Sequence, residues 1–327
     1  MKLTVAVVTY NHEKYIKQCL DGILMQQTDF DYEVVIGEDS GTDKTLSICE
    51  EYAIQYPQIK ILPKQERLGI GQNWLRVLKA CSGDYIAFCE GDDYWINSQK
   101  LQKQVEYLDA HPECSMCYTD CDIFYEASGT YDRSIFKNNH ASVNSLNPIL
   151  ARGYQSNVTW LFRKENIENL DFKNYSVDCS SVLLYELCLY GYIAQVPSLG
   201  STGVYRRHEH GATASTISEK QKYENDKESF LIRIEYAKFF PEKENVEFRL
   251  YLDSLENIFE KAVKFDDENV KSMYLSFFSN FENFRRLLFC LKEKNIQIQE
   301  LYESRRYKIG NCLLRPFVML KNIVRCH

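Results

Sequence analysis

The sequence predicts an α/β fold in which a mostly parallel central sheet is flanked by helices and followed by a helical C-terminal region. Three observations predict it. Short apolar, β-branched segments alternate with amphipathic segments in the first third of the chain. Polar and acidic residues follow the ends of several apolar segments. Beyond Ser218, apolar residues recur at helical spacing along highly charged stretches.

The first part of the chain alternates strands and helices in order. Strand–helix alternation at this pace implies right-handed crossovers and a parallel sheet that is covered on both faces. The predicted strands are Leu3–Thr9, Tyr32–Gly37, Ile59–Leu62 and Tyr85–Glu90, and the predicted helices between them lie within residues 12–26, 46–56 and 72–80.

The stretch CSMCYTDCDIF (Cys114–Phe124) is interpreted as a buried strand in which cysteine acts as a small hydrophobe. A zinc site of Cys114, Cys117, Cys121 and His111 is the alternative, but no second Cys/His pair stands at the distance that zinc modules use. Twelve cysteines, with Met1 and Lys2 leading directly into LTVAVVTY and no signal peptide, indicate reduced thiols in a cytoplasmic protein.

Composition narrows the function classes. The chain has 327 residues, 45% of them hydrophobic, and a net charge of −7. A protein that tracks nucleic-acid phosphates needs a basic face, so no nucleic-acid partner is expected. No stretch approaches the ~18 consecutive apolar residues that a membrane-spanning helix needs.

Polar residues follow three of the predicted strands: TYNH (Thr9–His12), GEDS (Gly37–Ser40) and EGDD (Glu90–Asp93). Ligands of open parallel sheets bind at these carboxyl ends. Polar strand ends also simply meet water, but adjacent acids at two ends of one edge favour a functional rim. Paired carboxylates suit Mg²⁺ or Mn²⁺, which complete their shells with water and phosphate oxygens. The chain has no G-x-x-x-x-G-K-[ST] loop.

Five stretches, in order, resemble family 2 inverting glycosyltransferases with the Rossmann-like GT-A fold. They are VAVVTYNHEKYIKQCLDGILMQ, YEVVIGEDSGTDKT, RLGIGQNW, GDYIAFCEGDDYW and GVYRRHEHGATAS. The resemblance covers roughly the first 215 residues. It implies a GT-A domain at 1–217, with a nucleotide-sugar-binding half at 1–124 and an acceptor half at 125–217. Residues 218–327 would form a helical region with a basic, apolar tail.

The resemblance also implies an activity: metal-dependent transfer of a sugar from a nucleoside diphosphate, with a UDP-sugar as the first expectation, to a glycan or lipid-linked acceptor in surface polysaccharide synthesis. Mn²⁺ or Mg²⁺ would be held by Asp93 and His208, and Asp178 would be the catalytic base. The implied nucleotide-sugar-binding residues are Thr9, Tyr10, Asn11, Glu38, Asp39, Arg67, Asp92 and Arg206, with Arg207 as an alternative to Arg206.

Alternatives stay open at several of these positions. Arg67 is equally explained as a solvated loop charge, and Asp178 as a helix cap. In the family an acid or glycine usually precedes the catalytic base, whereas Val177 precedes Asp178 here. Asp120 and Asp122 are weaker candidates for the catalytic base. A non-catalytic nucleotide-sugar-binding subunit is the rival function. A sugar nucleotidyltransferase would need a glycine-rich loop with arginine after the first strand, which TYNHEKY lacks.

The last segment differs from the acidic whole. Residues 304–327 contain six Lys/Arg and no acid, interleaved with CLLRPFVML. This pattern predicts peripheral contact with an anionic membrane surface, here the inner face of the membrane. A terminal helix that packs its apolar face on the protein is the alternative.

Overall fold

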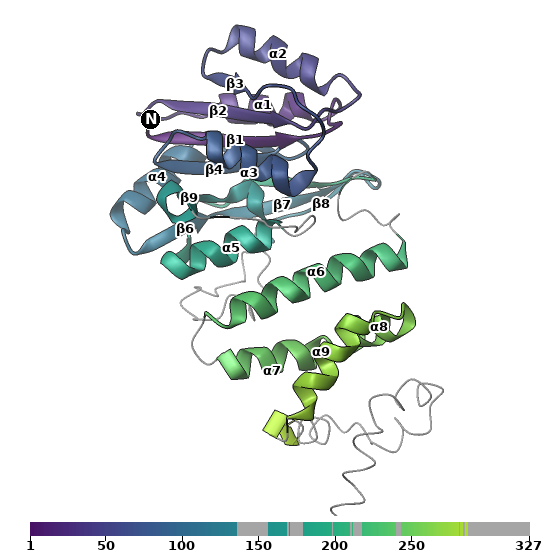
Figure 1. The fold of residues 1–327 in the computed structure, drawn as a ribbon. Coiled ribbons are helices and arrows are strands. Elements are labelled where there is room, and N and C mark those ends of the chain that lie inside the picture. Colours follow the sequence, from purple (N-terminus) through teal and green to yellow (C-terminus); the bar gives the residue numbers. More distant parts are fainter. Residues whose placement is uncertain are drawn as a thin grey trace, which may run out of the picture. The chain divides into compact units, whose positions relative to one another are not determined.

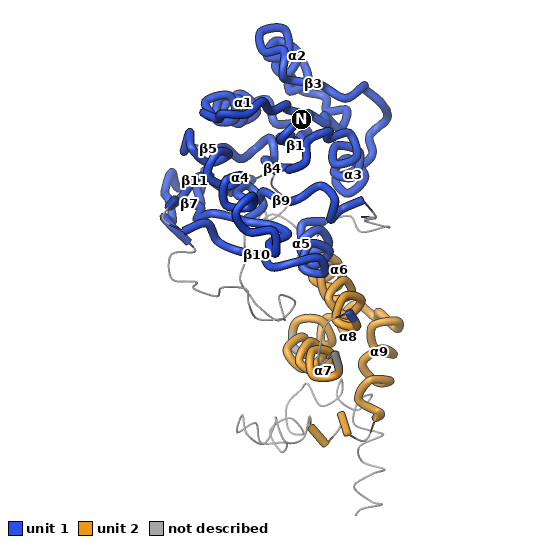
Figure 2. Tube along the Cα trace, turned by 90° about the vertical axis from the view of Figure 1, so that its left-hand side faces the viewer, with its two compact units in different colours: residues 1–217, 239–241 blue, residues 218–238, 242–327 orange. Residues whose placement is uncertain are grey.

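The computed structural model describes residues 1–135, 156–168, 170, 179–197, 199–209, 211, 218–239, 243–280, 282–283 and 285–286. The chain divides into two compact units, residues 1–217 with 239–241 and residues 218–238 with 242–327 (Figure 2).

The first unit is built on a seven-stranded sheet with the strand order β10-β6-β9-β4-β1-β2-β3 (Figure 1). Neighbouring strands are parallel except at β9, which runs antiparallel to β4 and β6. The strands are β1 (Leu3–Thr9), β2 (Tyr32–Glu38), β3 (Ile59–Ile61), β4 (Tyr85–Glu90), β6 (Cys114–Tyr118), β9 (Leu161–Arg163) and β10 (Tyr192–Gln195). The predicted α/β architecture with a mostly parallel sheet is therefore confirmed.

Helices flank this sheet and connect its strands (Figure 1). They are α1 (Ile16–Leu24), α2 (Thr45–Gln55), α3 (Ile70–Ala80), α4 (Lys100–Ala110) and α5 (Cys179–Tyr190). In α1 the residues at helical spacing, Ile16, Leu20 and Ile23, are all 0% exposed. Every residue of the central strand β1 is buried, which explains its continuous apolar sequence.

A second, four-stranded sheet has the order β5-β11-β7-β8. Its strands are β5 (Tyr94–Trp95), β7 (Asp120–Tyr125), β8 (Thr130–Asp132) and β11 (Ser201–Arg207). The stretch predicted as one strand from Cys114 to Phe124 therefore divides between two sheets. The chain passes from β6 to β7 at Thr119, whose hydroxyl hydrogen-bonds that of Thr202. Cys114, Cys117 and Cys121 are buried in these strands, as expected of small hydrophobes.

The second unit is helical in its described part. It contains α6 (Glu219–Ala237), α7 (Lys243–Asp253), α8 (Glu260–Lys264) and α9 (Glu268–Ser279), and its buried residues include Tyr223, Phe230 and Tyr274. Between α7 and α8 lies a π turn at Leu255–Phe259, where the Ser254 hydroxyl donates to the carbonyl of Leu250. None of the described helices is long and apolar enough to span a membrane.

Candidate functional site

The strand registers bring the carboxyl ends of β1, β2 and β4 to one edge of the large sheet. Thr9 at the end of β1 pairs with Glu38 of β2, and the neighbouring Val8 pairs with Glu90 of β4. Parallel neighbours end on the same side, so residues far apart in sequence meet here. Thr9 and Glu38 are buried, and the Glu38 carboxylate accepts from the amides of Ser40 and Gly41, which orders the loop after β2.

A tight turn carries the acids that follow β4. The Gly91 amide donates to the carbonyl of Val8 at 2.9 Å. A Cβ at Gly91 would lie 2.5 Å from Thr9 Oγ1, so only glycine allows the turn to pack this closely on β1. The turn thereby places Asp92 beside the end of the central strand.

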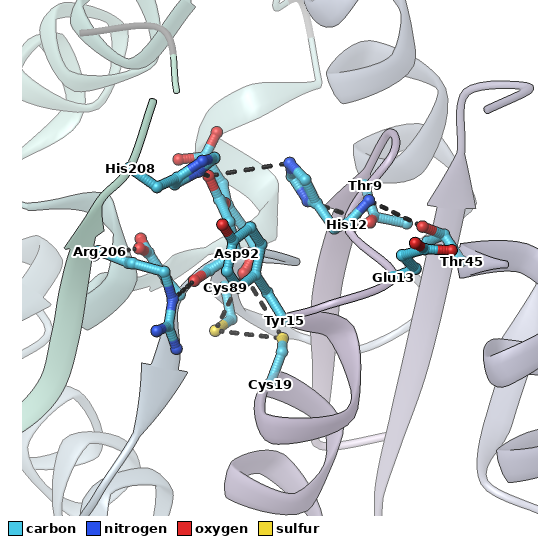
Figure 3. Close-up of polar contacts among 12 residues, drawn as sticks. Thr9, His12, Glu13, Tyr15, Cys19, Thr45, Cys89, Asp92, Arg206 and His208 are labelled. Carbon is cyan, nitrogen blue, oxygen red and sulfur yellow. Dashed lines mark hydrogen bonds and ion pairs between the residues drawn. The ribbon is translucent and has the colours of Figure 1, made fainter. Parts of the chain in front are cut away.

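Asp92 lies between two imidazoles (Figure 3). Its Oδ2 is 3.0 Å from His208 Nε2 and 3.8 Å from His12 Nε2. Burial acts to raise the pKa of Asp92, but the hydrogen bond from His208 and the charges of the two histidines outweigh it and lower the pKa. The Asp92 side chain is 18% exposed, and the lowered pKa keeps it a carboxylate.

His12 is a site residue that the sequence analysis did not single out. Its backbone amide donates to Thr45 Oγ1 at 2.7 Å, and its Nδ1 lies 3.2 Å from Thr9 Oγ1. Burial lowers the pKa of His12, which favours the neutral ring. Its position in TYNH, directly after a strand end, was the available signal, but nothing in the sequence shows that it faces Asp92.

Asp93 points into the protein, unlike its neighbour. It is 1% exposed, and its Oδ1 accepts from the backbone amide of Arg206 at 2.8 Å. Its Oδ2 has no hydrogen-bond partner within the described residues. Burial, reinforced by the charges of Asp92 and Glu90, raises the pKa of Asp93 well above its usual value. The two adjacent acids therefore differ in both access and charge.

Glu90 also belongs to the site, although the sequence analysis assigned it no role. Its Oε2 accepts from Asn157 Nδ2 at 3.0 Å. Burial and the charge of Asp92 raise the pKa of Glu90 to about 7. A partly protonated Glu90 limits the repulsion among three acids in one turn.

Tyr10, Asp39 and Arg67, predicted to bind the nucleotide, come together at the neighbouring strand ends. The Arg67 guanidinium lies 4.0 Å from the centre of the Tyr10 ring, and its Nε lies 3.9 Å from Asp39 Oδ2. The Asp39 carboxylate accepts from the amides of Leu68 and Gly69 at 2.8 and 2.9 Å. It therefore fixes the loop that carries Arg67.

The remaining predicted residues lie as follows. Asn11 is exposed, and its Oδ1 accepts from the Thr42 amide at 2.8 Å. Asp178 lies outside the described residues, which resume at Cys179, the first residue of α5. The weaker base candidates Asp120 and Asp122 are both buried, and Asp122 is held by Arg133 and Ser201.

The pair formed by Asp92, which is 18% exposed, and the buried His208 suits a divalent cation. Asp92 offers a carboxylate and His208 an imidazole, and two donors on one octahedral cation lie about 3 Å apart, which matches the 3.0 Å between Asp92 Oδ2 and His208 Nε2. An imidazole favours Mn²⁺ over Mg²⁺. Within the described residues, no three His, Cys, Asp or Glu side chains already form a metal-binding group, so a bound cation would need ligands from elsewhere, such as a diphosphate.

Comparison with known sequences places these residues in a family. A 35% identical protein of Mycobacterium tuberculosis, itself uncharacterized, aligns over 68% of this chain and 63% of its own length. The chain thus spans less than two thirds of that relative. The dTDP-rhamnosyl transferase RfbG of Shigella flexneri is 28% identical over 66% of this chain and 76% of its own length.

Solved structures share the fold. TarS of Staphylococcus aureus, solved with UDP-GlcNAc, superposes with a TM-score of 0.60 at 18% identity, covering 86% of this chain and 80% of that one. The mannosyltransferase PcManGT of Pyrobaculum calidifontis, solved with GDP-Man and Mn²⁺, gives 0.56 at 18% identity, over 98% and 87%. The architecture is thus that of GT-A glycosyltransferases. The sequence model described as glycosyl transferase family 2 matches residues 4–171, more than half of the chain and all three strand ends of the rim, so the chain belongs to that family.

Proposed function

We propose that this protein is a metal-dependent, inverting glycosyltransferase. It transfers a sugar from a nucleoside diphosphate sugar, with a UDP-sugar as the expected donor. The acceptor is a glycan or lipid-linked acceptor in surface polysaccharide synthesis, and the reaction takes place at the inner face of the membrane. The observation that carries the proposal is the Asp92–His208 pair, 3.0 Å apart at the end of the central sheet. A divalent cation held there would lie near the residues proposed to bind the nucleoside.

The donor assignment rests on the nucleoside-side residues and on the relatives. TarS was solved with UDP and with UDP-GlcNAc, whereas the archaeal mannosyltransferase was solved with GDP-Man. Asp39 is the residue proposed to accept from the uracil ring N–H, as the family resemblance implies. Both of its oxygens now accept from loop amides, so reading a base requires either a shared hydrogen bond or a shift of residues 67–69. Tyr10 offers an aromatic face for the base.

The proposed roles at the reacting end follow from access and charge. Asp92 and His208 hold the cation, which when bound stabilises the departing diphosphate. The family resemblance predicts that Asp93 holds the metal and that Asp92 binds the nucleotide-sugar, and the role of Asp93 stays a prediction. Geometry favours Asp92, because its Oδ2 lies 3.0 Å from His208 Nε2, whereas Asp93 Oδ1 accepts from the backbone amide of Arg206. Asp178 is proposed to take the proton of the acceptor hydroxyl.

A donor screen tests the proposal. Calorimetry would measure binding of UDP, GDP and dTDP, each with Mn²⁺ and with EDTA. We expect UDP to bind tightest and Mn²⁺ to strengthen it at least tenfold. Metal-independent binding of equal strength for all three would contradict the cation site and the base preference.

A second assay follows UDP release from UDP-sugars. Tight binding of UDP-sugars without any release in the presence of acceptor glycans would indicate the rival, a non-catalytic binding subunit.

A further inference from the structure

Arg206 was expected to face the diphosphate, but its side chain is used inside the protein. The residue is 8% exposed. Its Nε donates to the carbonyl oxygen of Asp92 at 2.8 Å, and its Nη2 donates to Gln18 Oε1 at 2.6 Å. Two of the three guanidinium nitrogens are thus engaged with the turn after β4 and with α1.

Aromatic rings enclose the rest of this guanidinium. Its central carbon lies 4.9 Å from the centre of the Tyr15 ring, 5.0 Å from that of Tyr94 and 5.5 Å from that of Phe124. Cation–π contacts of this kind stabilise a buried charge and restrict its rotamers. By contrast, the side chain of the adjacent Arg207 is exposed.

The end of β11 and the residue after it therefore make three contacts with the turn that carries Asp92 and Asp93. The Arg206 amide holds the Asp93 side chain. The Arg206 guanidinium holds the Asp92 carbonyl, and His208 meets the Asp92 carboxylate (Figure 3). The first contact holds a side chain of the turn, and the second holds the main chain from which the Asp92 side chain projects. Losing the guanidinium removes the only one of the three that acts on the Asp92 backbone.

We propose that Arg206 is a positioning residue: it locks the Asp92–Asp93 turn to β11 and α1 and thereby holds the Asp92 carboxylate where, with His208, it binds the divalent cation. This inference rests on the proposed function. Partners that orient a metal ligand typically contribute 10–100-fold in metal affinity. A direct contact between Arg206 and the diphosphate is the competing role, and the two differ in what happens without nucleotide.

The test uses the full chain and three variants. Arg206→Met keeps the apolar bulk among the rings but loses both hydrogen bonds. Arg206→Lys keeps the charge and can retain the bond to the Asp92 carbonyl. Arg163→Met is the matched control, since Arg163 is a half-buried arginine at β9 that also donates to carbonyls, those of Cys114 and Leu108. Free Mn²⁺ is quantified by its EPR signal during titration, and UDP binding by calorimetry with Mn²⁺ and with EDTA.

We expect Mn²⁺ affinity in the absence of UDP to fall at least tenfold in Arg206→Met, to recover partly in Arg206→Lys and to stay within twofold of wild type in Arg163→Met. UDP affinity in EDTA should be unchanged in all three. Unchanged Mn²⁺ affinity in Arg206→Met would overturn the inference. So would a loss of UDP affinity in EDTA, which would show that Arg206 touches the diphosphate. A wild type that binds neither Mn²⁺ nor UDP would instead overturn the proposed function.

Discussion

Asp92 and Asp93 are adjacent in the chain but lie in opposite environments. Asp92 faces two histidines, which lower its pKa, whereas Asp93 is buried among acids that raise its pKa. One carboxylate therefore lies beside the histidines and the other in the interior. The residue names alone do not say which, because the choice depends on where the Arg206 amide lies, 113 positions away.

Substituting each acid by asparagine separates their roles. Asp92→Asn should abolish the strengthening of UDP binding by Mn²⁺, because the neutral amide is a poor cation ligand. Asp93→Asn should keep most of that response, since asparagine resembles the protonated acid in size and can still accept from the Arg206 amide. Calorimetry with and without Mn²⁺ measures both. The opposite result, with the response lost only in Asp93→Asn, would restore Asp93 as the metal ligand.

Asp178 is the residue whose role rests most on resemblance. A general base acts on the acceptor, so Asp178→Asn should leave UDP-sugar affinity and melting temperature unchanged while turnover falls by ~10²–10⁴. Asparagine still caps a helix, so a purely capping Asp178 would tolerate the change. Near-wild-type transfer by this variant would reassign the base. The buried, hydrogen-bonded Asp122 is a poor substitute, because Arg133 and Ser201 already occupy its carboxylate.

At the scale of elements, helix α4 begins with a lysine that is fully buried. Lys100 is 0% exposed, and its Nζ lies 4.1 Å from the centre of the Trp95 ring. No hydrogen-bond partner for Nζ is present in the described part of the chain. The ring favours the charged ammonium, but burial has the larger effect and lowers the pKa of Lys100 from 10.5 to about 7.

This lysine predicts a specific pH dependence of stability. Between the folded pKa of about 7 and the ordinary value of 10.5, the unfolded chain binds more protons than the folded one, so the free energy of unfolding rises with pH. The rise is up to about 1.4 kcal/mol per pH unit. Buried thiols such as Cys117, whose pKa is raised to about 12, reverse the trend above the usual thiol pKa, so pH 7.0–8.5 is the useful window.

Urea unfolding at pH 7.0 and 8.5 measures the effect. Acids whose pKa is raised, such as Asp93, act in the opposite direction in every variant, so the comparison is of slopes. Lys100→Met should lose most of the Lys100 contribution to the wild-type slope. Lys103→Met, at an exposed position on the same helix, should keep it. Equal slopes for wild type and Lys100→Met would show that Lys100 stays charged in the folded protein, held by Trp95.

The elements also show what sequence patterns can and cannot predict. β1 and β4 have the predicted bounds, because strands buried on both faces give unbroken apolar runs. The three-residue β9 and two-residue β5 give no periodic signal, since their pairing is set by distant strands. The strand ends that form the rim were predictable from topology. The position of His12 opposite His208, and the inward turn of Arg206, depend on tertiary contacts between β1, β4 and β11.

At the scale of the whole molecule, the family model ends at residue 171 and leaves the helical unit and the tail without an assigned role. The helical unit has its own aromatic core, in which Tyr251 stacks on Phe277 at 4.0 Å. The strand ends that form the rim lie in the first unit, so the proposed donor site belongs to that unit.

The segment 304–327, which lies outside the described residues, is predicted to bring the protein to an anionic membrane. The segment contains six Lys/Arg and no acid, whereas the whole chain has a net charge of −7. Each basic residue near an anionic surface contributes about 1 kcal/mol, and this attraction weakens with salt.

In flotation assays, the full chain should bind phosphatidylglycerol vesicles at low salt and release at high salt, and should not bind phosphatidylcholine vesicles. Replacing Arg305, Arg306 and Lys308 by glutamine should weaken binding at least tenfold, whereas a matched triple change of the exposed Lys14, Lys17 and Lys44 should not. Equal binding to both vesicle types, or none to either, would favour a tail that packs on the protein itself.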